Sequence, residues 1–250
     1  MKLLLLTLCL LGNSSVDVLS VAKNFLGVPY VAGTLESEGE EQLVVNTEGL
    51  DCTTFVELSV AGWLALKSDS ADFERHVQAL RYRDGIVDGY LSRLHYFTDW
   101  VEENSCRGIW HELSPEADSA LWRHYPLELS FMSSHQQSYP YLQTHAWAVD
   151  SMRAIESRYD GHTVYYIDKA YLNRPPEALP IRNGDILALV TTIEGLDVTH
   201  LGFAVWQGDK LHLMHASTVY KKVVVDEQSL YDYLRTRKSC PGVRVVRLCD

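Results

Sequence analysis

One cysteine of the chain, Cys52, stands where a helix is predicted to begin. Apolar residues recur at helical spacing after it, so we expect a helix over residues 52–67 with Asp51 as its N-cap. A cysteine in the first turn lies near the positive end of the helix dipole and near unpaired backbone amides, which favour the thiolate. The pattern therefore indicates a nucleophilic thiol. The alternative is a buried structural cysteine, because free cysteines are among the most buried residues.

A thiol nucleophile needs a base, and the base needs a group that orients its ring. Ten histidines are available. Two predicted strands, residues 199–206 and 211–217, are separated by a turn at Gly208-Asp209. With that turn, Trp206 faces Leu211, and this pairing fixes the register of the hairpin.

In this register His200 and His215 fall on the same face of the sheet, because side chains alternate along a strand. Gly202 lies opposite His215 and leaves room for its ring, whereas His212 points to the other face. The sequence thus favours His200 and His215 as the partners of the thiol. Two ordinary, half-exposed sheet histidines are the alternative.

The elements around these residues are predicted from periodicity and turn signals. The last seventy residues are expected to form a β-meander with strands at 186–192, 199–206, 211–217, 219–226 and 243–248 and a helix at 227–237. Nearer the N-terminus we expect a helix capped by Ser15 and ending at Gly27, and a short strand at 43–46. Residues 68–180 read as mixed helical pieces.

The composition limits the domain organisation and the partners that the protein can have. With 250 residues, 46% of them hydrophobic and 22% charged, the chain fits one large domain or a domain with a sizeable insertion. Its formal net charge of -11 argues against nucleic acid or an anionic membrane surface as a partner, because both require clustered Lys and Arg.

Residues 1–12 carry one lysine and an apolar run, as a secretory signal does. The run is too short for a stable membrane span, so we expect an exported, periplasmic or extracellular protein. A first buried helix or a truncated signal is the alternative. The five cysteines form no metal-binding C-x-x-C motif, so no metal is expected, and Cys240 with Cys249 is the only plausible disulfide pair.

Four segments resemble, in order, the signatures of NlpC/P60 cysteine peptidases, which are papain-like cell-wall enzymes. They are Gly27-Val28-Pro29-Tyr30, Asp51-Cys52-Thr53-Thr54-Phe55-Val56, His200-Leu201-Gly202-Phe203-Ala204-Val205 and Met214-His215-Ala216-Ser217. The resemblance implies an α+β fold in which a helix bearing the cysteine packs on an antiparallel sheet bearing the histidines. It also implies Cys52 as nucleophile, His200 as general base, His215 as orienting residue, Tyr30 near the thiol and Asp51 beside the substrate amine.

The sequence departs from that family in two ways. The usual Asp-Cys-Ser-Gly reads Asp-Cys-Thr-Thr, in which Thr53 keeps a hydroxyl but narrows the subsite, and Cys52 and His200 are much farther apart in sequence than in the compact family core. The fuller pattern, including residues 34–36, 92–100, 138–140 and 195–200, resembles the DUF1460 branch. That branch is described as N-acetylmuramoyl-L-alanine amidase-like.

The resemblance implies a catalytic core of residues 13–67 and 181–250 and a long, mainly helical insertion of residues 68–180 that shapes the pocket. Four residues of the insertion could contact a sugar-linked peptide: Arg93, His95, Tyr96 and Trp100. Of these, Arg93, His95 and Trp100 could equally form an internal network that holds the insertion to the core. The implied reaction is hydrolysis of the amide between muramic acid and L-alanine in a peptidoglycan fragment, without a cofactor. A γ-D-glutamyl-diamino acid endopeptidase and a non-catalytic wall-binding protein are the alternatives.

Overall fold

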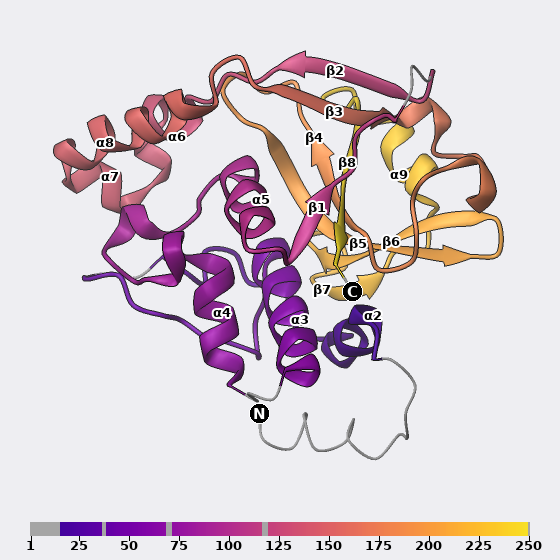
Figure 1. Ribbon diagram of the computed structural model, residues 1–250, viewed down its shortest axis with the longest axis horizontal. Coiled ribbons are helices and arrows are strands. Elements are labelled where there is room, and N and C mark those ends of the chain that lie inside the picture. Colours follow the sequence, from indigo (N-terminus) through magenta and orange to yellow (C-terminus); the bar gives the residue numbers. More distant parts are fainter. Residues whose placement is uncertain (1–15, 37–38, 69–71, 117–119, 250) are drawn as a thin grey trace.

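One antiparallel sheet forms the centre of the molecule (Figure 1). The computed structural model describes residues 16–36, 39–68, 72–116 and 120–249, so the expected signal at residues 1–12 lies outside the described residues. The strand order is β2-β3-β8-β4-β5-β6-β7, and β1 also pairs with β8. The strands are β1 (Trp110–Glu112), β2 (Trp122–Pro126), β3 (Thr163–Asp168), β4 (Ile186–Val190), β5 (Val198–Gln207), β6 (Lys210–Ser217), β7 (Lys222–Val225) and β8 (Gly242–Leu248).

Helices pack on both faces of this sheet, which gives the α+β class that the sequence indicates (Figure 1). One face is covered by α2 (Val18–Ala22), α3 (Cys52–Lys67), α4 (Phe73–Arg81) and α5 (Phe97–Cys106), and the other by α9 (Leu230–Arg235). A third apolar cluster holds α6 (Phe131–Ser134), α7 (Pro140–Thr144) and α8 (Ala146–Glu156). Within the described ranges no helix has the length and apolar character needed to cross a bilayer.

Helix α3 begins and ends where the sequence predicts, and Asp51 is its N-cap. The Asp51 carboxylate accepts a hydrogen bond from the Thr54 amide at 2.8 Å, and the Thr54 hydroxyl accepts one from the Asp51 amide at 2.9 Å. This reciprocal capping satisfies amides that a helix start leaves unpaired. It fixes the first turn, and with it the position of Cys52.

The predicted register of the β5–β6 hairpin is confirmed. Trp206 pairs with Leu211, and the pairing continues to Phe203 and Met214. Alternate residues of β5 and β6 enter opposite cores, with Phe203 on the face of α3 and Leu213 on the face of α9. Because side chains alternate between the two faces along a strand, this register decides which histidines can contact each other.

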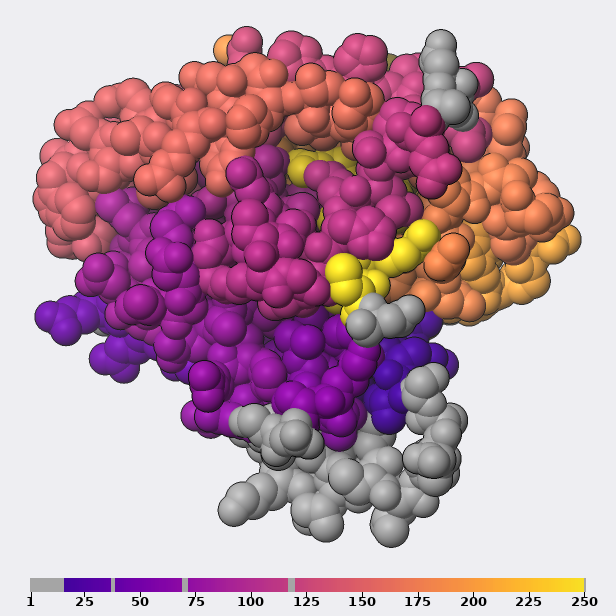
Figure 2. Space-filling model, in the orientation of Figure 1, coloured from indigo at the N-terminus to yellow at the C-terminus, as the bar shows by residue number. Residues whose placement is uncertain are grey.

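The segment 68–180, expected to be mainly helical, also contributes strands β1, β2 and β3 to the central sheet. Strand β8 pairs with β3 and β1 on one side and with β4 on the other, so the C-terminal strand lies inside the sheet. Gly242 makes this possible, because a Cβ there would collide with the carbonyl oxygen of Ile167. In the space-filling view, yellow C-terminal residues emerge beside magenta residues of this segment (Figure 2).

Three local expectations are wrong. Residues 43–46 form no strand, and helix α2 begins at Val18 with Asp17 as its cap, whereas Ser15, the expected cap, lies outside the described residues. Cys240 and Cys249 are both free thiols. They lie beyond opposite ends of β8, whose seven residues span about 23 Å in extended form, too far for a disulfide.

A buried ion pair joins α3 to α4. The guanidinium of Arg81 lies 2.9 Å from the carboxylate of Glu57, and both side chains are about 2% exposed. Arg81 also donates to the carbonyl of Val44. Because removal of one partner leaves a buried charge uncompensated, each residue depends on the other.

We therefore expect Arg81→Met to lower the free energy of unfolding by about 3–5 kcal/mol. The double variant Glu57→Leu/Arg81→Met should lose less, since it leaves no unpaired charge. Urea denaturation of both proteins measures the difference. A single variant as stable as the wild type would contradict the structural role given to this pair.

Candidate active site

Cys52 and His200 line one small hollow between α3, the start of β5 and the segment before α5. The hollow has a volume of about 130 Å³. Its walls come from residues far apart in sequence: Cys52, Thr53, Leu94, His95, Tyr96, Phe97, Trp100, Leu196, Asp197, Val198, Thr199, His200 and Leu201. The fold thus brings the predicted thiol and the predicted base to the same cavity.

His200 and His215 are in direct contact. The distance from His200 Nε2 to His215 Nδ1 is 2.6 Å, and the rings meet edge to face with centroids 4.8 Å apart. A Cβ at Gly202 would lie 2.6 Å from the Met214 carbonyl oxygen and 3.0 Å from His215 Cβ, so only glycine fits beneath this pair. His212 does not take part, because its Nδ1 is bonded to the backbone carbonyl of Asp226.

Asp226 extends this contact to a third group that the sequence analysis missed. Its Oδ2 lies 3.4 Å from His215 Nε2, and both side chains are buried. Its Oδ1 accepts a hydrogen bond from the amide of Gln228 at 2.9 Å. The pairing of β6 with β7 could have revealed it, because Val224 faces His215 and Asp226 is two residues further along the chain.

The electrostatics of the site favour neutral groups. Burial and the adjacent Asp51 carboxylate raise the pKa of Cys52 to about 11, although hydrogen bonds from Leu201 and Thr53 act in the opposite direction. Burial and the charge of Arg237 lower the pKa of His200 to about 4. Burial also lowers the pKa of His215, which lies against His200. The raised pKa of Cys52 opposes the thiolate that the sequence favours, because desolvation outweighs the helix terminus.

The predicted substrate residues separate into two groups. Thr53, His95, Tyr96 and Trp100 line the hollow, whereas Arg93 does not. Arg93 is buried, pairs with Glu36 at 2.7 Å and donates to the backbone carbonyl of Leu35. Of the two roles left open by the sequence, Arg93 has the internal one.

The side chains from the insertion are held firmly in place. The Tyr96 hydroxyl donates to Glu156 at 2.6 Å and accepts from the Met132 amide at 2.8 Å. His95 contacts the Tyr90 carbonyl through Nε2 at 2.9 Å, and its burial lowers its pKa to about 3. Trp100 packs against Trp110, with ring centroids 4.3 Å apart.

A buried network ties this wall of the hollow to the sheet. Asp197, just before β5, accepts hydrogen bonds from the amide and hydroxyl of Thr98 at 2.8 and 3.0 Å. The Thr98 hydroxyl accepts one from Arg244 of β8, which is paired with Glu112 of β1 at 2.6 Å. The position of α5 over the thiol is therefore fixed by the two strands.

Tyr30 and Asp51 lie next to the thiol but are not among the residues that line the hollow. Asp51 caps the helix that Cys52 begins. Burial raises the pKa of the Tyr30 phenol, and the nearby Cys52 and Asp51 raise it further. Asp51 therefore acts on the electrostatics of the thiol from outside the cavity.

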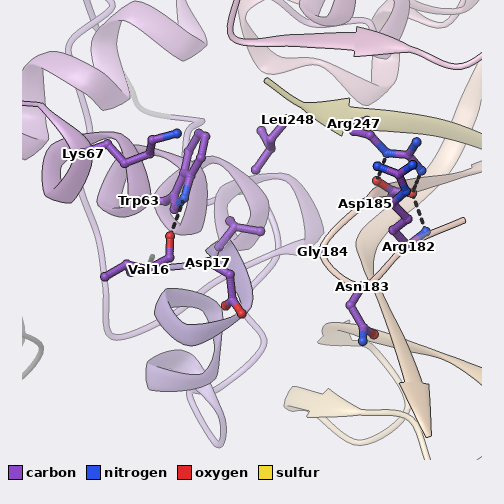
Figure 3. Close-up of a pocket in the computed structure, with 11 residues that line it drawn as sticks. Val16, Asp17, Trp63, Lys67, Arg182, Asn183, Gly184, Asp185, Arg247 and Leu248 are labelled. Carbon is purple, nitrogen blue, oxygen red and sulfur yellow. Dashed lines mark hydrogen bonds and ion pairs between the residues drawn. The ribbon is translucent and has the colours of Figure 1, made fainter. Parts of the chain in front are cut away.

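Another hollow, of about 310 Å³, lies at the far end of α3 (Figure 3). There the Trp63 indole donates to the Val16 carbonyl, Lys67 lies over the Trp63 ring, and Arg247 pairs with Asp185. Cys52 and Lys67 are the two ends of α3, about 22 Å apart at 1.5 Å per residue. This hollow is therefore separate from the thiol site.

The neutral resting state predicts the pH dependence of thiol reactivity. Since the Cys52 pKa is raised to about 11, the rate of alkylation by iodoacetamide should rise continuously between about pH 6 and about pH 10. Mass spectrometry of the modified peptide separates Cys52 from the exposed Cys106. A rate that is already constant above about pH 5 would indicate a preformed thiolate–imidazolium pair and contradict this reading.

Comparison with known proteins identifies the family to which the chain belongs. The AmiA-like family, described as N-acetylmuramoyl-L-alanine amidase-like, matches residues 20–243. An N-acetylmuramoyl-L-alanine amidase from Bacteroides uniformis ATCC 8492 has a similar structure, with 41% identity and a TM-score of 0.87 over 94% of this chain and 98% of that one. No curated protein matches the chain.

Two further structures are similar. A candidate xylanase from Bacteroides fragilis is 41% identical, with a TM-score of 0.83 over 92% of this chain and 100% of that one. A DUF1460 protein from Legionella pneumophila has 23% identity and a TM-score of 0.70 over 94% and 89%, which supports the fold alone. Because the family match spans most of the sequence, the chain belongs to the AmiA-like, N-acetylmuramoyl-L-alanine amidase-like family.

Proposed function

We propose that this protein is a cysteine-dependent amidase that hydrolyses the bond between N-acetylmuramic acid and L-alanine in peptidoglycan fragments. The observation that carries the proposal is the placement of Cys52 and His200 in one hollow, with His200 bonded to His215 and His215 close to Asp226. Membership of an amidase-like family supports this choice of scissile amide bond. The resemblance to NlpC/P60 enzymes is part of the same proposal.

The proposed tautomers follow from the neighbours of each ring nitrogen. His215 Nε2 lies 3.4 Å from the Asp226 carboxylate and has no other hydrogen-bond partner among the described residues, so in the proposed mechanism it carries a proton, which leaves His215 Nδ1 as an acceptor. His200 Nε2 would then donate to His215 Nδ1 and carry the proton of neutral His200. Its Nδ1 keeps a lone pair and can act as the base.

In the proposed reaction Cys52 attacks the carbonyl carbon of the lactyl amide while His200 takes the thiol proton. The imidazolium that forms is stabilised through His215 by Asp226, as a carboxylate supports the base in other triads. His200 returns the proton to the leaving amine of L-alanine, and a thioester remains. Water, activated by His200, then releases the carboxylic acid and restores the thiol.

The start of α3 would stabilise the oxyanion. The Cys52 backbone amide belongs to the first turn, where helix amides have no partner within the helix. Since the neutral thiol and imidazole are both favoured by burial, charge develops only in the transition state. Preorganised donors are most effective under that condition.

The hollow fits amide hydrolysis better than glycoside hydrolysis. A glycosidase generally needs two carboxyl groups facing the scissile bond. Among the described residues that line the hollow, Asp197 is the only acid, and it is buried and bonded to Thr98. The xylanase description of the Bacteroides fragilis protein is therefore not carried over to this chain.

The insertion would shape the pocket. Thr53, His95, Tyr96 and Trp100 line the hollow and would contact the sugar or the peptide beside the scissile amide. Tyr30 and Asp51 adjoin the thiol and would act on the amine side. Arg93 would keep the insertion in place through Glu36.

A peptidoglycan substrate also bears on where the protein acts. We propose that the protein is exported to the periplasm or the exterior, where peptidoglycan lies. The apolar residues 1–12 support this, since they resemble a secretory signal.

The direct test is digestion of defined muropeptides with mass readout. We expect release of an intact peptide that begins with L-alanine and of a free N-acetylmuramoyl sugar, and we expect Cys52→Ala to abolish it, because loss of a triad nucleophile costs several orders of magnitude. Fragments cut after D-glutamate would indicate the endopeptidase. Binding without cleavage by wild type would indicate a wall-binding protein and refute the amidase.

Asp226 gives a second prediction. Asp226→Asn should lower kcat by about 10- to 10,000-fold with little change in KM, because the amide can no longer fix the histidine tautomers. Asp209→Asn, in the exposed turn between β5 and β6, is the matched control. An Asp226→Asn enzyme with wild-type kcat would remove Asp226 from the mechanism.

A further inference from the structure

Arg237 is a cation without an acidic partner, close to the candidate catalytic histidines. Its guanidinium lies over the ring of Tyr233, 4.1 Å from the centroid. Tyr233 in turn meets the ring of His215 edge to face, at 5.8 Å between centroids. A chain of ring contacts therefore links this cation to His200 through Tyr233 and His215.

The guanidinium lines a hollow of about 250 Å³ on the α9 side of the histidines. Tyr220, Gln228 and Thr236 supply further polar walls. Asp226 also lines it, but this carboxylate is 3% exposed and is engaged by the Gln228 amide and His215. It does not form an ion pair with Arg237.

Arg235, two residues earlier, differs from Arg237 because it pairs with Asp232 at 3.1 Å. Arg237 makes no ion pair with any residue in the described ranges, in a chain with a net charge of -11. An exposed arginine stacked on an aromatic ring is held in one direction and keeps its donors free.

We propose that Arg237 binds a carboxylate of the peptide part of the substrate. The inference rests on the proposed function, because in an N-acetylmuramoyl peptide the lactyl carboxyl is consumed in the amide, and the free carboxylates belong to the peptide. Guanidinium groups bind carboxylates through paired, charge-assisted hydrogen bonds. The leaving peptide would therefore extend from Cys52 past the histidines towards α9.

The electrostatics agree with this geometry. The charge of Arg237 adds to burial in lowering the pKa of His200, so the cation is within electrostatic reach of the base. The carboxylate of a bound peptide would offset that charge. The substrate would then restore part of the basicity that its own hydrolysis requires.

The first test measures binding without turnover. Isothermal titration calorimetry with L-alanyl-D-glutamate and with its diamide should give about tenfold or greater preference for the diacid in the wild type, as expected for one charge-assisted pair. Arg237→Gln should lose this preference and Arg237→Lys should keep part of it. Arg235→Gln, on the same turn of chain, is the control and should bind as the wild type does.

The second test measures turnover of N-acetylmuramoyl-L-alanyl-D-glutamate and its diamide. Arg237→Gln should lower kcat/KM about tenfold or more for the diacid, mainly through KM, and leave the diamide unchanged. Equal losses on both substrates, or no preference for the diacid in wild-type binding, would overturn the proposal. If the wild type cleaves neither compound, the proposed amidase function is refuted. The calorimetric measurement still shows whether Arg237 binds a carboxylate.

Discussion

The short contact between His200 and His215 depends on one strand register and on one glycine. A shift of β5 against β6 by a single residue would turn one of the two rings to the opposite face, because side chains alternate along a strand. A side chain at position 202 would displace His215. The contact between His200 and His215 therefore rests on the pairing of two adjacent strands, β5 and β6, whereas Cys52 is brought to His200 by the packing of α3.

The environment of the thiol depends, by contrast, on contacts that are distant in sequence. The wall formed by residues 94–97 and Trp100 reaches Cys52 because Thr98 bonds to Asp197 and to Arg244. Arg244 belongs to β8, which lies between β1 and β3 of the insertion on one side and β4 of the core on the other. The segment that would select the substrate is thus part of the same sheet as the segment that would carry out the chemistry.

Burial determines the charge state of this site. A helix N-terminus alone would favour a thiolate, and hydrogen bonds from Leu201 and Thr53 act in the same direction. Desolvation of the thiol and the imidazole outweighs these dipoles, and the resulting pKa values of Cys52 and His200 favour the neutral forms. In the proposed mechanism, proton transfer would therefore accompany attack, and the charge on the imidazole would be shared with His215 and Asp226.

Local patterns by themselves determined α3, its Asp51 cap and the β5–β6 register, because helix capping and strand alternation involve only neighbouring residues. Nothing local could place β8 between β3 and β4, or separate the buried Arg93 from the pocket-lining His95. Those outcomes are set by pairings across more than fifty residues. The desolvation of Cys52 also depends on residues far apart in sequence, because several segments pack around the thiol. Only the tertiary structure therefore decides its pKa.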